Sequence, residues 1–124
     1  MSLTNCRILV VEDEFMVAHD LQLELEEAGA VILGPEASIR GALKRIDDES
    51  RIDAVVLDIN LEGKLSFVVA DAMKAKQIPF IFASGYEDEA LSSRYPNVIN
   101  CRKPFVTRDL LESLIRCLNG VIKD

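Results

Sequence analysis

The stretch that decides the fold is Asp53-Ala54-Val55-Val56-Leu57-Asp58-Ile59-Asn60, in which a short apolar run stops at a carboxylate. A run this short, with two β-branched residues, is typical of a strand buried on both faces, as in a parallel sheet. Ligands and reacting groups gather at the carboxyl ends of the strands in open α/β sheets. The sequence therefore predicts that Asp58 lies at such an end and reacts there.

The composition favours one acidic, globular domain. The chain has 124 residues, of which 49% are hydrophobic and 28% charged, and its formal net charge is -7. This length predicts one core. The acidic balance argues against nucleic acid as a direct partner, and no apolar run approaches the roughly 20 residues of a membrane span. Three separated cysteines without a CxxC pair favour reduced thiols in the cytoplasm. We expect one cytoplasmic domain, residues 1–124, without an output domain.

Apolar runs and helical stripes alternate along the chain. Strands are expected at 7–11, 30–33, 54–57, 79–83 and 97–99. Helices are expected at 15–28, after an N-cap at Ser38, after an N-cap at Ser66 and as far as about 76, at 87–93, and after an N-cap at Thr107. Gly34-Pro35 closes the second strand in this interpretation, and 61–64 forms a loop. The alternation predicts an α/β, flavodoxin-like (βα)5 fold: a doubly wound, five-stranded parallel sheet in the order 2-1-3-4-5.

In that order the first and third strands are neighbours, so Glu12, Asp13 and Asp58 meet at one edge of the sheet. Carboxylates at close range repel one another, and a hard divalent cation such as Mg²⁺ relieves the repulsion. For the acidic triplet Glu12-Asp13-Glu14 taken alone, a solvated loop before a helix is the simpler interpretation. The carboxylate that ends the neighbouring strand favours the cation site instead.

Two further polar side chains follow the last two strands. Ser84 would add a hydroxyl donor beside Asp58, and Lys103 an ammonium that reaches a phosphoryl oxygen. Taken singly, each is more simply a turn serine or a surface lysine. Together with the carboxylates they supply what phosphoryl transfer needs, which is a nucleophile and groups that neutralise developing charge.

The chain resembles the receiver domain of two-component response regulators over essentially its full length. The matching residues, in order, are Glu12-Asp13, Asp58, Ser84 and Lys103-Pro104-Phe105. The resemblance implies that Asp58 accepts a phosphoryl group from a sensor histidine kinase, and that Ser84 and Lys103 bind that group. It also implies a cis peptide bond between Lys103 and Pro104. The implied ligands of Mg²⁺, or of another divalent cation, are Glu12, Asp13, Asp58 and the backbone carbonyl of Asn60.

The fourth strand and its loop place the chain near one subgroup of receivers. The stretch Pro79-Phe80-Ile81-Phe82-Ala83-Ser84-Gly85-Tyr86 resembles a Pro-Phe-x-Phe-Ala-Thr-Gly-Tyr motif, with Ser in place of Thr. Many receivers carry Tyr or Phe three residues before the lysine, where this chain has Asn100. Our hypothesis is that Tyr86 takes part in switching in place of that ring. The alternative is that Tyr86 only packs on the short helix that follows it.

The resemblance implies a single-domain response regulator, not primarily an enzyme, with weak self-phosphorylation and autodephosphorylation. Such a protein acts as a monomer or weak dimer, by binding a downstream protein target or as a phosphate sink beside a competing regulator. The first helix is expected to meet the kinase. The alternatives are a small Mg²⁺-dependent phosphohydrolase with an aspartyl-phosphate intermediate, a receiver that is never phosphorylated, and a fragment of a longer regulator. Asn60 argues against the hydrolase, which needs a second Asp at that position.

Overall fold

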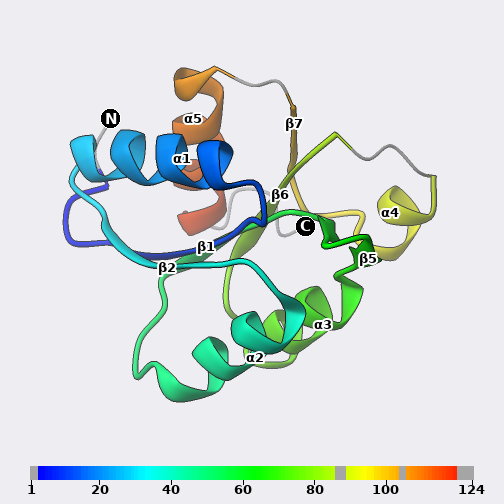
Figure 1. Ribbon diagram of the computed structural model, residues 1–124. Coiled ribbons are helices and arrows are strands. Elements are labelled where there is room, and N and C mark those ends of the chain that lie inside the picture. The colour runs from blue at the N-terminus through cyan, green and yellow to red at the C-terminus, as the bar shows by residue number, and fades with distance from the viewer. Residues whose placement is uncertain (1–2, 86–88, 104–105, 120–124) are drawn as a thin grey trace.

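A five-stranded parallel sheet forms the centre of the computed structural model, which describes residues 3–85, 89–103 and 106–119 (Figure 1). The strand order is β2-β1-β3-β6-β7, which confirms the predicted 2-1-3-4-5 topology. The strands are β1 (Arg7–Val11), β2 (Val31–Glu36), β3 (Ala54–Leu57), β6 (Phe80–Ser84) and β7 (Asn100–Arg102). In the described part of the chain, no helix is long and apolar enough to cross a membrane.

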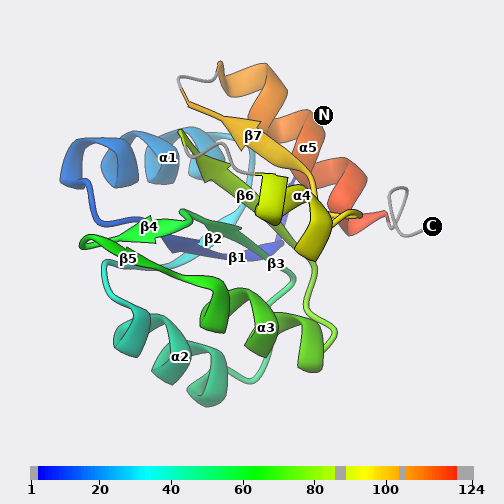
Figure 2. The same cartoon turned by 90° about the vertical axis from the view of Figure 1, so that its right-hand side faces the viewer.

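Helices cover both faces of this sheet (Figures 1 and 2). They are α1 (Phe15–Glu27), α2 (Ile39–Asp48), α3 (Phe67–Ala75), α4 (Glu89–Arg94) and α5 (Thr107–Leu118). One core packs α1 and α5 against the sheet, through buried residues such as Leu21, Leu25 and Leu110. The other core packs α2 and α3 against the opposite face, through residues such as Ile46 and Met73. The central strands β1, β3 and β6 lie between these two cores and are apolar on both faces.

The pairing of β1 with β3 brings the acidic residues together. Val11 lies opposite Leu57 in the parallel register, and all four residues of β3 are buried. The next residues along the two strands are Glu12 and Asp58. Because parallel strands end at the same edge, both carboxylates leave the sheet side by side, as the sequence predicts.

Two connections differ from the prediction. The second strand does not close at Gly34-Pro35 but continues to Glu36, because a register shift in the pairing with β1 accommodates one extra residue between Leu33 and Glu36. The predicted loop at 61–64 is a hairpin of β4 (Asn60–Leu61) and β5 (Lys64–Leu65). Its turn residues Glu62 and Gly63 have φ of 53° and 80°. Positive φ at both central residues is what a two-residue hairpin turn requires.

The last strand was predicted three residues too early. It begins at Asn100 rather than Asn97, because a turn follows α4, in which the Val98 N–H donates to the Tyr95 carbonyl at 3.2 Å. The described part of the fourth helix begins at Glu89, and residues 87 and 88 of its predicted range lie outside the described residues. Thr107 is not the N-cap of α5. Val106 takes that position, so the Thr107 side chain already belongs to the first helical turn.

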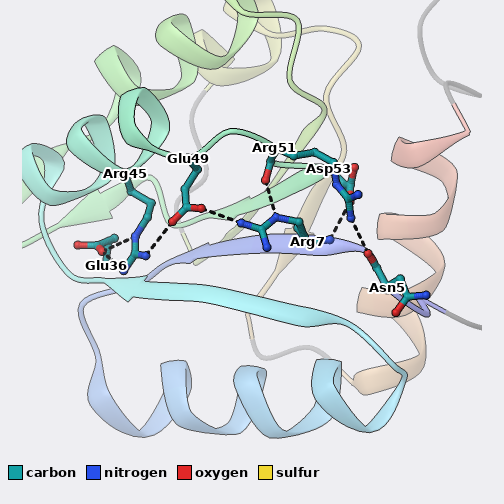
Figure 3. Close-up of polar contacts among 7 residues, drawn as sticks. All are labelled: Asn5, Arg7, Glu36, Arg45, Glu49, Arg51 and Asp53. Carbon is teal, nitrogen blue, oxygen red and sulfur yellow. Dashed lines mark hydrogen bonds and ion pairs between the residues drawn. The ribbon is translucent and has the colours of Figure 1, made fainter.

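A network of arginines and acids, called the arginine cluster below, joins the starts of β1 and β3 to α2 (Figure 3). Arg7 pairs with Glu49 at 2.7 Å, and Arg45 bridges Glu49 at 3.1 Å and Glu36 at 2.8 Å. Arg51 lies 3.3 Å from Asp53 and donates to the Asn5 carbonyl. The cluster consists of Asn5, Arg7, Glu36, Arg45, Glu49, Arg51 and Asp53. Its three guanidinium groups face three carboxylates, so its charges balance.

Candidate phosphoacceptor site

Asp58 is buried at the carboxyl end of β3, with 5% of its surface exposed. Its backbone N–H donates to the Val11 carbonyl of β1 at 3.0 Å. Its side-chain Oδ1 accepts the backbone N–H of Asn60 at 3.0 Å. The carboxylate is thus held by the main chain on one oxygen while its other oxygen points to the neighbouring charged groups.

The Lys103 ammonium lies among three carboxylates. Its Nζ is 2.7 Å from Glu12 Oε1, 3.1 Å from Asp58 Oδ2 and 3.4 Å from Glu14 Oε1. Lys103 directly follows β7, and the acids directly follow β1 and β3. The structure therefore brings Glu12, Asp58 and Lys103 together, as the sequence predicts from the strand order.

The protonation of this cluster follows from burial and charge. Burial raises the pKa of Glu12 to about 7, although the hydrogen bond from Lys103 opposes the shift. Burial alone lowers the pKa of Lys103, but hydrogen bonds to Glu12 and Asp58 outweigh it and raise that pKa above its ordinary value. The ammonium accordingly stays charged near neutral pH, and the carboxylates around it outnumber it.

This cluster fits a hard cation. Oxygen atoms of Glu12, Glu14 and Asp58 all lie within 4.8 Å of one another. Mg²⁺ takes carboxylate oxygens in small numbers and keeps several waters. One ammonium leaves part of the negative charge uncompensated, and Glu14 is exposed, so the group is open to solvent on one side. The donor set, charge and access therefore suit a hydrated divalent cation.

The close group of carboxylates contains Glu14 in addition to the predicted Glu12 and Asp58, and it does not include the predicted Asp13. Glu14 belongs to the close group of carboxylates, and the sequence analysis left it out, although it completes the acidic triplet that pointed to the site. The Oδ2 atom of Asp13 accepts the backbone N–H of Glu62 at 2.8 Å. That bond ties the hairpin to the loop after β1. The role of Asp13 and of the Asn60 carbonyl as metal ligands stays a prediction.

Several predicted residues lie outside what the structure describes. Tyr86 and Pro104 are not among the described residues, nor is the side chain of Ser84, whose backbone ends β6. The expected cis bond at Lys103–Pro104 is therefore untested. A cis bond does occur at Gly34–Pro35.

Asn100 opens β7 opposite Phe82 of β6, at the position where many receivers carry a ring. Its amide Oδ1 is buried and has no hydrogen-bond partner in the part of the chain that the structure describes. A buried acceptor without a donor is uncommon in folded proteins. This atom marks the predicted switch position as one where hydrogen bonding is incomplete.

Tyr95, which the sequence analysis did not single out, ties the end of α4 to α3. Its ring packs edge-on against Phe80 and Phe82, and its hydroxyl donates to Asp71 Oδ1 at 2.7 Å. Burial and the Asp71 carboxylate raise the pKa of Tyr95 to about 12. Arg94 donates to the other oxygen of Asp71 at 2.7 Å. These contacts fix one end of α4 beside the core.

The comparisons with known proteins point to regulators of one kind. No family model matches the sequence. SdrG from Sphingomonas melonis Fr1 is 38% identical, with a TM-score of 0.80 over 95% of this chain and 99% of SdrG. SdrG has also been solved in a BeF3-activated conformation. A response regulator receiver protein from Sinorhizobium medicae WSM419 is 26% identical, with a TM-score of 0.84 over 96% of this chain and 98% of that protein.

A curated relative is longer than this chain. The phyllosphere-induced regulator PhyR from Methylorubrum extorquens is 30% identical over 79% of this chain, which corresponds to 38% of PhyR. The chain spans less than half the length of the curated relatives it matches. The similarity therefore concerns one part of those regulators.

Proposed function

Because this chain belongs to the receiver domains of response regulators, we propose that it accepts a phosphoryl group on Asp58 from a sensor histidine kinase and thereby switches its protein contacts. The observation that carries the proposal is the Asp58 carboxylate at the end of β3, 3.1 Å from the Lys103 ammonium, within a group of acids suited to a cation. The proposed unit is one receiver domain formed by residues 1–124.

In the proposed reaction a carboxylate oxygen of Asp58 attacks the phosphorus of the phosphohistidine. The new O–P bond forms as the N–P bond breaks, and the imidazole nitrogen keeps the electron pair. The buried Asp58 is held for this attack by the Asn60 N–H and by its backbone bond to Val11. Positioning of this kind, together with electrostatic stabilisation, is most of what a protein contributes to phosphoryl transfer.

Lys103 supplies the fixed positive charge. It lies between the loop after β1 and the end of β3, so it can move from the carboxylates to an oxygen of the incoming phosphoryl group without leaving the site. Glu12, Glu14 and Asp58, with Asp13 and the Asn60 carbonyl as further candidates, would hold Mg²⁺. When bound, Mg²⁺ neutralises negative charge on the transferred group. Ser84 is proposed as a hydroxyl donor to that group.

The proposal includes slow hydrolysis of the aspartyl phosphate by water, but no further enzymatic activity. The phosphohydrolase alternative has no support from the comparisons, which match regulators. We propose that the protein is a monomer or weak dimer in the cytoplasm. It either binds a downstream protein target or acts as a phosphate sink, accepting phosphoryl groups from a kinase that it shares with another regulator. Tyr86 and Asn100 are the residues proposed to transmit the change.

Exposed apolar side chains beside the site support a protein partner there. Phe15 and Met16 at the start of α1 are 78% and 66% exposed, and Val106 before α5 is 61% exposed. Phe15 directly follows Glu14, and Val106 lies three residues after Lys103 in the sequence. Apolar residues around a reactive group suit the docking of a kinase helix.

The experiment that tests the proposal is phosphorylation by acetyl phosphate in the presence of Mg²⁺, followed by intact mass spectrometry. The wild-type protein should gain the mass of one phosphoryl group, and Asp58→Asn should not. Removal of the cation with EDTA should abolish the gain. A phosphoryl group on Asp58→Asn, or on another residue of the wild type, would contradict the proposal.

A further inference from the structure

Two serines precede helices in this chain, and their hydroxyl groups do different things. Ser38 caps α2, where its Oγ accepts the Gly41 N–H at 3.0 Å. Ser66 takes the N-cap position of α3, but its side chain makes no cap hydrogen bond. Instead its Oγ donates to the backbone carbonyl of Asp58 at 2.7 Å. The sequence analysis predicted the same capping role for both.

The bond from Ser66 is made in a fully enclosed place. Ser66 has 0% of its surface exposed, and Asp58 has 5%. A buried carbonyl without a donor costs more than an exposed one, since no water replaces the lost partner. A hydroxyl that leaves the helix terminus to satisfy this carbonyl therefore matters for the conformation of Asp58.

Ser66 also holds the neighbouring peptide through its own backbone. Its N–H donates to the Ile59 carbonyl at 2.7 Å, next to the paired hairpin residues Asn60 and Leu65. Its carbonyl accepts the N–H of Val69, at 3.0 Å, in the first turn of α3. One residue thus joins α3, the hairpin and the two residues that follow β3.

The backbone of Asp58 is consequently held on both sides of its Cα atom, in the Leu57–Asp58 peptide and in the Asp58–Ile59 peptide. The N–H of Asp58 is bound by β1, and its carbonyl is bound by Ser66. Rotation of the Asp58–Ile59 peptide would move the Asn60 N–H away from Asp58 Oδ1, because the peptide, the N–H and the carboxylate belong to three consecutive residues. The carboxylate would then lose one of the contacts that orient it toward Lys103. The backbone near the phosphoacceptor therefore depends on a side chain eight residues away.

We propose that Ser66 is a positioning residue for the phosphoacceptor: its buried hydroxyl orients the Asp58–Ile59 peptide, and thereby the Asp58 carboxylate, for phosphoryl transfer. This inference rests on the proposed function of Asp58. It assigns Ser66 no contact with the phosphoryl group or the cation.

The test is a graded series at Ser66 with a matched control. Ser66→Cys keeps the size and leaves a weak donor, and Ser66→Ala leaves none. Ser38→Ala removes a hydroxyl that serves only a helix terminus. Each folded variant is phosphorylated by acetyl phosphate with Mg²⁺, and the initial rate per folded molecule is followed by intact mass. Asp58→Asn gives the background.

The expected order of rates is wild type, then Ser66→Cys, then Ser66→Ala, with the last about tenfold below the first, the factor of one ordinary hydrogen bond. Ser38→Ala should react at the wild-type rate even where it unfolds at lower urea concentration. The ¹⁵N resonance of Ile59, whose peptide nitrogen adjoins the bonded carbonyl, should shift in both Ser66 variants and not in Ser38→Ala.

Equal rates for wild type and Ser66→Ala would overturn the inference, whatever the resonance of Ile59 does. A loss of rate in Ser38→Ala as large as that in Ser66→Ala would also overturn it, because stability alone would then explain both. Failure of the proposed function is a separate result. In that case the wild type gains no more phosphoryl than Asp58→Asn.

Discussion

The molecule contains two networks of buried and half-buried charge that obey different rules. In the arginine cluster, three guanidinium groups face three carboxylates, and each is held by at least one partner at 3.3 Å or less. The other network, called the acidic site below, consists of Glu12, Glu14, Asp58 and Lys103. Its three carboxylates share the one Lys103 ammonium. Both networks involve β1 and β3, the first at their starts and the second beyond their ends.

The difference shows what each network is for. Balanced ion pairs join elements of the fold and leave no charge over, so the arginine cluster is complete as it stands. A surplus of carboxylates costs free energy through repulsion, and a protein keeps such a surplus where another charge arrives during function. In our proposal the acidic site receives a cation and a phosphoryl group, whereas the arginine cluster receives neither.

The largest effect is expected for Lys103→Met. Removal of the ammonium leaves Glu12 and Asp58 buried without their cationic partner, which lowers the free energy of unfolding by about 3 kcal/mol. Mg²⁺ should restore part of the loss, since it binds the folded state. Urea unfolding followed by circular dichroism, with and without Mg²⁺, measures both. Lys76→Met, which breaks the exposed pair with Asp47, is the matched control and should change little.

The next effect is a pH dependence that belongs to Glu12. Its pKa is raised from 4.5 to about 7 by burial, so the folded protein holds the proton more tightly than the unfolded chain does. The resulting stabilisation is complete below the unfolded value and is lost as the pH rises through the folded one. Without Mg²⁺, stability should fall by about 2 kcal/mol between these values.

Urea midpoints measured across this pH range test the assignment to Glu12. The variant Glu12→Gln should lack the slope, because it has no proton to lose. A slope of the same size in Glu12→Gln would show that another group carries it.

Asp58→Asn should stabilise the metal-free protein, by about 1 kcal/mol, because it removes one of the repelling carboxylates while Lys103 keeps Glu12 as its closest partner. The measurement is the free energy of unfolding in EDTA. Loss of stability would mean that the acidic site is as balanced as the arginine cluster.

Glu49→Gln makes the same chemical change in the arginine cluster and should have the opposite sign. It leaves Arg7 and Arg45 without the carboxylate that joins them. The expected loss is about 0.5 kcal/mol, since these side chains are a fifth to a third exposed and solvent screens them. The same unfolding experiment decides the sign, and a gain in stability would remove the contrast between the two networks.

The fold was predictable where the sequence pattern is local and strong. The buried run at 54–57 and the stripes of α1, α2 and α5 fix strands and helices, and the strand order then brings Glu12, Asp58 and Lys103 together. The last strand was misplaced because Val98 and Ile99 look more like a strand than Asn100 and Arg102 do. Tyr95, Pro96 and Asn97 form the turn before it, which is where such residues are common.

The parts that the sequence did not reveal depend on long-range hydrogen bonds. The hairpin after Asp58 has no alternating pattern. Asp13 accepts the N–H of its turn residue Glu62, and Ser66 donates its N–H to the carbonyl of Ile59, directly before the hairpin. Ser66 looks like an ordinary helix cap, and only the fold shows that its hydroxyl reaches Asp58. Glu14 likewise joins the cluster because α1 begins directly after it.

The most direct test of the contrast between the two networks is an NMR titration of the protein with Mg²⁺ and then with beryllofluoride, a phosphoryl analogue. We predict that amide resonances of the loop after β1, of Asp58–Asn60 and of Lys103 shift at each step, while those of Arg7, Arg45 and Arg51 stay in place. In Asp58→Asn the beryllofluoride step should produce no shifts. Beryllofluoride shifts that persist in Asp58→Asn, or that centre on the arginine cluster, would contradict the account.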